Sequence, residues 1–327
     1  MNINPHSRKL HRYRQTPAHR ALVAETHLNP AQFVMPIFVH EDLVDPQPIA
    51  SLPGISQWPL SHLNNEVESI LKTGIRSVIL FGIPNHKDPA ATEAYNTNGI
   101  VQRAIRQLKT AFPDLIVMAD CCLCEYTSHG HCGLLKPGQE PHFDLTQTLE
   151  TLGKTALSYA EAGADIIAPS GMMDGMIAHL RTTLDAAQFD SVALMSYAVK
   201  FASNFYGPFR DAAGSAGNFI GDRKHHQLAY TQRREALLEA ADDEAEGADF
   251  LMVKPAMAYL DIIRDLRNTT HLPLAAYHVS GEYSMIKAAA EKGILDEHAA
   301  FDECFTALRR AGTDIIISYA AKAFWTR

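Results

Sequence analysis

The sequence predicts a (β/α)₈ barrel, a TIM barrel, preceded by an extended N-terminal arm. Eight short apolar runs of strand length recur between residues 33 and 318, and helix-like stretches separate them. The runs are almost continuously hydrophobic, as expected for parallel strands that are covered on both faces. The main rival is an open doubly wound sheet, but no G-x-G-x-x-G motif follows the first run. The length of 327 residues therefore suits one catalytic barrel domain over residues 31–327.

The expected strands are 33–39, 77–83, 115–119, 164–169, 192–199, 248–253, 272–279 and 314–318. Between them, residues 146–161, 233–246 and 283–292 place apolar side chains at helical spacing. A glycine shortly precedes four of the strands, where the C-terminal end of a helix is expected: Gly74, Gly163, Gly247 and Gly312. These alternations account for nearly all of the chain after residue 30.

Residues 1–30 form the predicted arm. This segment has little apolar periodicity and contains five basic side chains: Arg8, Lys9, Arg12, Arg14 and Arg20. A solvated arm and an arm that wraps around a neighbouring subunit both fit this composition.

Overall composition limits the classes of protein. The net charge of -8 argues against general nucleic-acid binding. The sequence has no apolar run long enough for a membrane span, and its first residues lack the apolar core of a signal peptide. Four of the five cysteines fall between residues 121 and 132, which favours metal binding in a reducing compartment over disulfides. We therefore expect a cytoplasmic enzyme that binds neither membrane nor nucleic acid.

Reactive side chains gather at the ends of the expected strands. Asp120 follows the third strand, Lys200 the fifth and Lys254 the sixth, whereas Ser280 and Tyr319 follow the seventh and eighth. Active sites of these barrels lie at the C-terminal ends of the strands. The sequence therefore predicts an active site at this end of the barrel.

The two lysines indicate covalent chemistry. Either one alone could be a salt-bridged or snorkelling side chain. Burial lowers the pKa of a lysine and frees the amine to attack a carbonyl carbon. Lys200 and Lys254 on adjacent strands therefore indicate Schiff-base chemistry on two carbonyl groups held side by side.

The cysteine cluster predicts a metal site. Three of its members have the spacing C-x-C-x₇-C: Cys122, Cys124 and Cys132. A catalytic zinc has three protein ligands and an open position, whereas a fourth ligand, His129 or His131, would make the site structural. Asp120 favours the open site, because a nearby carboxylate can move a proton of a metal-bound water.

The segment 204–224 is rich in glycine and alanine and resembles a lid over the site. Arg210 and Arg223 lie in it and could each grip a carboxylate by paired hydrogen bonds.

The chain resembles the porphobilinogen synthase family, also called 5-aminolaevulinate dehydratase, over nearly its whole length. The matching stretches are 120–133, 168–170, 173–175, 207–213, 221–224, 252–255, 259–261 and 277–282. The resemblance implies a lyase of tetrapyrrole biosynthesis that condenses two 5-aminolaevulinate molecules to porphobilinogen with loss of two waters.

The resemblance also implies roles for single residues. Lys200 and Lys254 would form the Schiff bases. Arg210 and Arg223 would bind one substrate carboxylate, and Ser280 and Tyr319 the other. Two positions depart from the usual family pattern: Gly171 replaces an acidic residue, and Met176 replaces an arginine.

The metals and the assembly are implied in the same way. The cysteine motif resembles the zinc-using branch, in which the three cysteines would hold a catalytic Zn²⁺. Glu239 matches a position that many bacterial members use for an allosteric Mg²⁺. The family is typically a homooctamer whose N-terminal arms embrace neighbouring subunits.

Two other functions remain open from the sequence. A class I aldolase-type Schiff-base lyase needs one lysine and no metal, so the cysteine cluster counts against it. A non-catalytic, zinc-binding regulatory protein would use a structural site, and loss of zinc would then unfold it.

Overall fold

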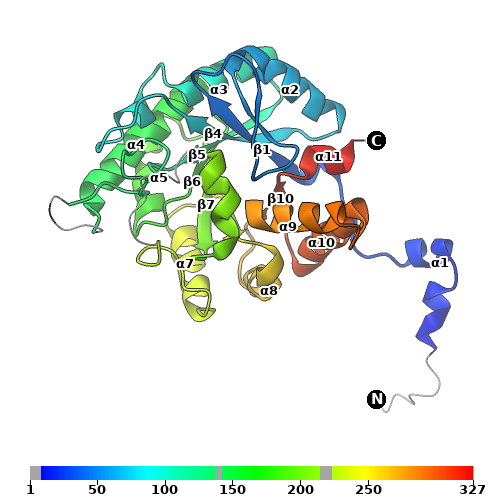
Figure 1. Ribbon diagram of the computed structural model, residues 1–327. Helices are drawn as coiled ribbons and strands as arrows, with labels where there is room; N and C mark the ends of the chain where they lie inside the picture. Colours follow the sequence, from blue (N-terminus) through cyan, green and yellow to red (C-terminus); the bar gives the residue numbers. More distant parts are fainter. Residues whose placement is uncertain (1–8, 137, 139–141, 214–222, 327) are drawn as a thin grey trace.

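A closed barrel of eight parallel strands forms the centre of the protein, as predicted (Figure 1). The computed structural model describes residues 9–136, 138, 142–213 and 223–326. The barrel strands follow one another in chain order, and the last closes on the first. They are β1 Phe33–His40, β4 Ser77–Ile83, β5 Ile116–Cys121, β6 Ile166–Pro169, β7 Ala193–Lys200, β8 Phe250–Lys254, β9 Leu274–His278 and β10 Ile315–Ser318.

The expected strands overlap all eight observed ones, and their ends differ by two residues or fewer. The differences matter at the C-terminal ends: β5 includes Asp120 and Cys121, and β7 and β8 each include their terminal lysine. Strand pairing therefore fixes the backbone of these functional residues directly.

A small hairpin after β1 was not predicted. Its strands are β2 Gln47–Pro48 and β3 Ser56–Trp58, and β3 also pairs parallel with β1. Both strands are short and carry polar residues, so they give no apolar periodicity.

Helices surround the barrel (Figure 1). They are α2 Leu60–Lys72, α3 Ile100–Ala111, α4 Leu145–Ala162, α5 Met176–Ala186, α6 Gly207–Ala212, α7 Arg234–Ala245, α8 Leu260–Thr269, α9 Ser280–Glu291, α10 Glu297–Ala311 and α11 Ala321–Trp325. Short 3₁₀ turns are η2 Pro30–Gln32, η3 Thr92–Tyr95, η4 Asn204–Tyr206 and η5 Met257–Tyr259. Helix α4 shows how local sequence sets the boundaries: the Asp144 side chain caps its first turn, and Gly163 ends it with φ 103°.

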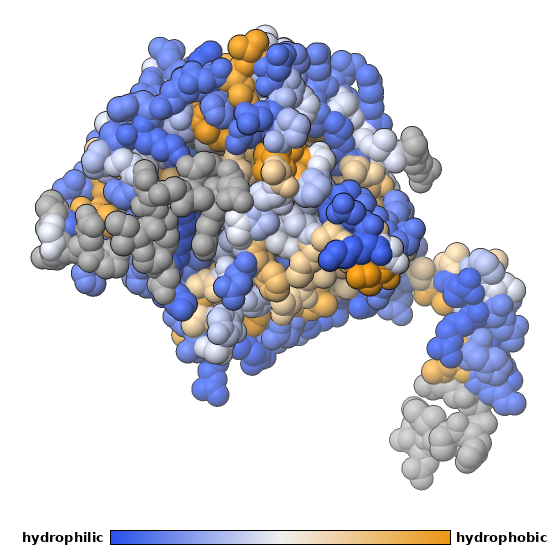
Figure 2. Space-filling view, viewed as in Figure 1, coloured by the Kyte–Doolittle hydropathy of each residue, from blue (hydrophilic) through white to orange (hydrophobic). Residues whose placement is uncertain are grey.

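The described part of the arm lies outside the barrel. Its elements are η1 Leu10–Arg14 and α1 Pro17–Leu22, which project away from the other helices (Figure 1). Hydrophobic and hydrophilic residues both lie on its surface (Figure 2). Tyr13 is 55% exposed and Leu22 is 85% exposed, so more than half of each side chain is open to solvent within the subunit.

None of the helices in the described ranges is both long and apolar enough to cross a membrane.

Candidate active site

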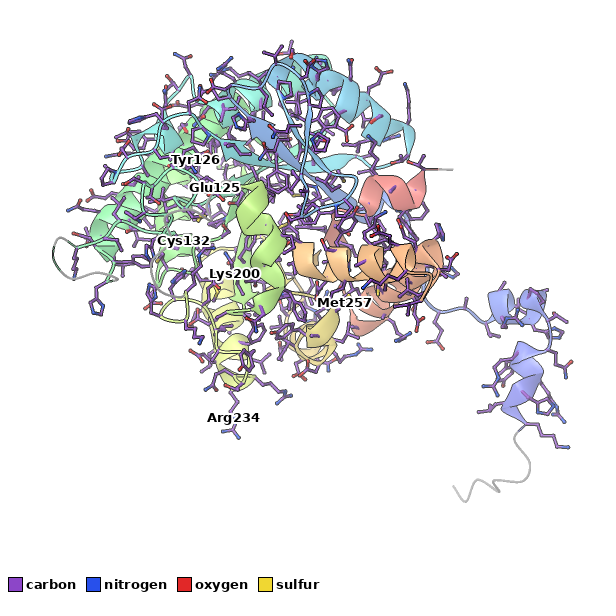
Figure 3. All side chains as sticks on the ribbon, viewed as in Figure 1. Glu125, Tyr126, Cys132, Lys200, Arg234 and Met257 are labelled. Atoms are coloured by element: carbon purple, nitrogen blue, oxygen red, sulfur yellow. The ribbon has the colours of Figure 1, made fainter. Side chains whose placement is uncertain are left out.

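The two lysines lie directly opposite each other at the C-terminal ends of β7 and β8. Their Cα atoms are partners in the parallel ladder, and both side chains are buried. Figure 3 labels Lys200 at this end of the barrel and Cys132 in the loop region after β5. Pairing in register places two amines in one pocket, as the sequence predicted.

The Lys200 amine has polar neighbours. Its Nζ donates a hydrogen bond of 2.6 Å to the backbone oxygen of Ser170, at the end of β6. The Ser170 hydroxyl in turn donates to Oδ2 of Asp120 over 3.1 Å. Ser170 therefore connects the amine of Lys200 to the Asp120 carboxyl.

Four aromatic rings surround the Lys254 amine, and one of them, Tyr197, is also 5.5 Å from the Lys200 amine. Its Nζ is 4.1 Å from the ring centre of Tyr277 and 4.9 Å from that of Tyr197. The rings of Phe209 and Tyr206 lie at 5.4 and 5.6 Å. Burial, followed by the charge of Lys200, lowers the pKa of Lys254 to about 7. A substantial fraction of this amine is therefore neutral, and nucleophilic, near neutral pH.

Asp120 has an unusual protonation equilibrium for a carboxyl group. Burial and then the neighbouring Glu125 carboxyl raise the pKa of Asp120 to about 7, although the charges of Lys254 and Lys200 oppose this change. The group can therefore both accept and donate a proton near neutral pH.

The three predicted metal ligands come together. The Sγ atoms of Cys122, Cys124 and Cys132 all lie within 4.8 Å of one another, and all three residues are buried. Hydrogen bonds from Cys122 and Cys124 lower the pKa of the Cys132 thiol well below its usual value. This trio of soft donors fits a metal ion such as zinc.

No other His, Cys, Asp or Glu among the described residues joins the three sulfurs within the same distance. His129 and His131, the proposed fourth ligands, are therefore outside this group. Cys121 points elsewhere, with its Sγ 3.8 Å from the backbone oxygen of Leu152 in α4. Neither of the two predicted histidines therefore lies within this distance of all three sulfurs.

Glu125 is a neighbour of the trio that sequence reasoning missed. It is 3% exposed, and the Cys124 thiol donates to its Oε2 over 3.1 Å. Burial raises the pKa of Glu125. The sequence does show a carboxylate directly after Cys124, and this position could have pointed to Glu125.

Three of the four predicted carboxylate-binding residues face one pocket. Arg223, Ser280 and Tyr319 line it together with both lysines. Arg223 also donates from Nη2 to the backbone oxygen of Gly130 over 3.2 Å, which links it to the cysteine loop. The backbone of Arg210 lies in α6, and the predicted lid over 204–224 begins with η4 and α6, whereas its residues 214–222 are outside the described ranges.

The pocket encloses about 320 Å³, its open mouth included. Its lining residues are Lys200, Tyr206, Phe209, Arg223, Lys254, Tyr277, Val279, Ser280 and Tyr319. The roles of Tyr206 and Phe209 could not be predicted, because aromatic residues after a strand are common in hydrophobic cores. The pocket combines cationic, hydroxyl and aromatic groups, as an acidic ketone substrate would require.

Glu239 lies elsewhere, half-buried on α7. It lines a separate hollow with Asp174, Glu235, His225 and His226. Burial, followed by the charge of Asp174, raises the pKa of Glu239. Several carboxyl groups therefore lie near Glu239, and a bound cation would offset their mutual repulsion.

Comparisons with known proteins identify the family of the chain. A sequence model of the family described as delta-aminolevulinic acid dehydratase matches residues 7–326. Proteins of that name from Bacillus subtilis strain 168 and Escherichia coli strain K12 are each 52% identical to this chain; the match covers 95% of this chain in both cases, and 95% and 94% of the relatives.

A crystal structure of delta-aminolevulinic acid dehydratase (porphobilinogen synthase) from Toxoplasma gondii, in complex with the reaction product porphobilinogen, is also similar. It superposes with a TM-score of 0.94 at 41% identity and covers 97% of this chain and 90% of that one.

Proposed function

Given that the chain belongs to the delta-aminolevulinic acid dehydratase family, we propose that Lys200 and Lys254 carry out its reaction, the condensation of two 5-aminolaevulinate molecules to porphobilinogen. The observation that carries this assignment is the pair of buried amines, in register on β7 and β8, that face one pocket. The product is the pyrrole of porphyrin biosynthesis, and the enzyme is a lyase because two waters leave.

Each lysine attacks the ketone carbon of one substrate. The amine forms a C–N bond, the ketone oxygen leaves as water, and a protonated Schiff base remains. This cation draws electrons from the neighbouring carbon and eases formation of the C–C and C–N bonds between the two substrates. Lys254 is well suited to this attack near pH 7, because its pKa is lowered to about 7.

The aromatic rings around Lys254 affect both the neutral amine and the charged Schiff base. They exclude water, which favours the neutral amine before attack. After attack, their faces can stabilise the positive charge of the Schiff base by cation–π interaction. Tyr277 at 4.1 Å is the nearest of these rings.

The substrate carboxylates are held at the pocket wall. Arg223 and Arg210 would bind one, and Ser280 and Tyr319 the other. Ser280 is close to the backbone of α6, because the Phe209 amide donates to its hydroxyl over 3.1 Å. Holding both substrates makes their reaction effectively intramolecular.

Asp120 and Ser170 are the groups best suited to move protons. The carboxyl of Asp120 titrates at about pH 7 and accepts a hydrogen bond from Ser170, whose backbone oxygen binds Lys200. A proton lost from substrate carbon or nitrogen near Lys200 can therefore pass to Asp120.

The cysteine trio can hold a metal ion, and we propose that it is zinc. The fit rests on three buried sulfurs within 4.8 Å of one another. A bound zinc would supply Lewis-acid polarisation of a substrate oxygen. The protein places the trio close enough to Lys254 for the charge of Cys124 to affect its pKa.

We extend the proposal to the assembly and to a second metal. Glu239 would attract Mg²⁺ to the acidic hollow on α7. The arm comprises residues 1–30. Its exposed apolar residues would be buried against a neighbouring subunit in a homooctamer. The proposed location is the cytoplasm, where the thiols would stay reduced.

Borohydride trapping with 5-aminolaevulinate tests the function. Reduction of the Schiff base should leave substrate on Lys254 and Lys200, which peptide mass spectrometry would locate. Absence of adducts on both lysines in folded protein would overturn the proposal. An adduct on a single lysine with no metal dependence would favour an aldolase-type lyase, and unfolding after zinc removal would favour a structural metal site.

A further inference from the structure

Glu282 is a fully buried carboxylate that the proposed mechanism does not use. It lies in the first turn of α9, two residues after Ser280, and has an exposed fraction of 0%. Among the described residues it forms no ion pair with a lysine, arginine or histidine. A buried carboxylate without a cation needs several hydrogen-bond donors to offset its desolvation.

Backbone amides from two separate segments supply these donors. Oε2 accepts from the amide of Val279 over 2.9 Å, at the start of α9. Oε1 accepts from the amides of Met257 and Ala256 over 2.7 and 3.2 Å, directly after β8. One carboxylate therefore joins the chain just beyond Lys254 to the chain just before Ser280.

A local capping role explains only half of these contacts. The bond to Val279 is the usual one from the third residue of a helix back to its N-cap. The bonds to Ala256 and Met257 cross to a different strand end and cap no part of α9. This second set of contacts is the unexplained feature.

The same junction also holds the aromatic wall of the pocket. A Cβ on Gly281 would lie 2.5 Å from the backbone oxygen of Phe205, so only glycine allows α9 to approach η4 this closely. The hydroxyl of Tyr206, at the end of η4, is shared between the backbone oxygens of Phe201, at 2.8 Å, and Lys254, at 3.1 Å. The ends of β8 and α9 and the η4 turn thus form one packed unit with Glu282 inside it.

We propose that Glu282 is a positioning residue that fixes the Lys254 amine relative to the substrate-carboxylate group Ser280. The inference rests on the proposed function, in which Lys254 forms a Schiff base and Ser280 binds a carboxylate of the substrate. A misplacement of about 1 Å between a reacting group and its substrate can reduce the rate about 100-fold. A change at Glu282 should therefore affect Lys254 much more than Lys200, which is held by Ser170 instead.

The substitution Glu282→Gln keeps the size of the side chain and replaces one acceptor oxygen with an NH₂ group. That group cannot accept a hydrogen bond, so one of the two segments loses its partner. We expect kcat to fall about 100-fold and the ratio of borohydride-trapped adduct on Lys254 to that on Lys200 to fall about tenfold. A purely structural role would lower both adducts together with the folded fraction and leave their ratio unchanged.

Glu66→Gln is the matched control. Glu66 is also a buried carboxylate, on α2, and pairs with Lys322 over 2.6 Å outside the catalytic pocket. This variant should lose thermal stability and keep the wild-type adduct ratio. If Glu282→Gln does not fold, Glu282→Asp serves instead, since it keeps the charge and is one methylene too short to reach both segments.

A folded Glu282 variant with the wild-type adduct ratio would overturn the inference, whatever its kcat. Wild-type protein that traps substrate on neither lysine would instead overturn the proposed function. The two failures are therefore distinguishable in one set of measurements.

Discussion

Lys200 and Lys254 occupy equivalent positions on neighbouring strands, yet their surroundings differ. Lys200 donates to a backbone oxygen and connects through Ser170 to Asp120. Lys254 lies among four aromatic rings, and its pKa is lowered to about 7. The position of each amine is therefore set by the end of its strand. Its reactivity is set by the side chains and loops that pack around the amine.

Replacement of Lys254, the lysine surrounded by aromatic rings, should reduce activity most. Lys254→Met should keep the fold, because methionine is unbranched and apolar, and should reduce pyrrole formation by roughly 10⁴-fold or more. Turnover assays and circular dichroism would check this. Measurable turnover near the wild-type rate would contradict the role of Lys254.

The next largest effect concerns the cysteine trio. Chelation of the metal should reduce turnover by roughly 100-fold or more without unfolding the protein, and zinc should restore activity better than magnesium. Cys132→Ser should behave like the chelated protein.

The matched control for the trio is Cys304→Ser, because Cys304 is only half-buried and lies on α10. This variant should retain zinc and activity. Equal losses in both cysteine variants would argue against a dedicated metal site.

The effect of the Lys200 charge on the pKa of Lys254 can be measured from the pH dependence of borohydride trapping. Attack on the substrate requires neutral Lys254, so trapping on this residue should rise with pH through about 7 and level off above it. In Lys200→Met the neighbouring positive charge is gone, and the pKa of Lys254 should increase. Trapping on Lys254 at pH 7 should then fall roughly two- to tenfold, and its midpoint should move to higher pH.

An unchanged midpoint in Lys200→Met would show that burial alone, without the second amine, lowers the pKa of Lys254.

The smallest expected effect lies outside the pocket. Glu239→Gln should reduce any stimulation by magnesium by a few-fold and leave activity without magnesium unchanged. Glu244→Gln on the exposed side of α7 is the control, and it should respond to magnesium like the wild type. Equal stimulation of all three proteins would place the effect of magnesium elsewhere.

Sequence alone came close to the barrel, because each parallel strand must be apolar on both faces and leaves a continuous hydrophobic run. The hairpin of β2 and β3 was missed for the opposite reason, since its strands are too short and too mixed in polarity to leave a hydrophobic run. The reactive side chains at the strand ends could also be recognised in the sequence, because lysine and cysteine are unusual directly after a hydrophobic run.

The sequence by itself determined the eight strands, the thiols and the two lysines, since periodicity and spacing along the chain carry that information. Tertiary structure alone decided which amine lies among aromatic rings, and that Glu282 connects the ends of β8 and α9. These features depend on residues far apart in sequence, and burial and hydrogen bonding between such residues arise only when the barrel closes.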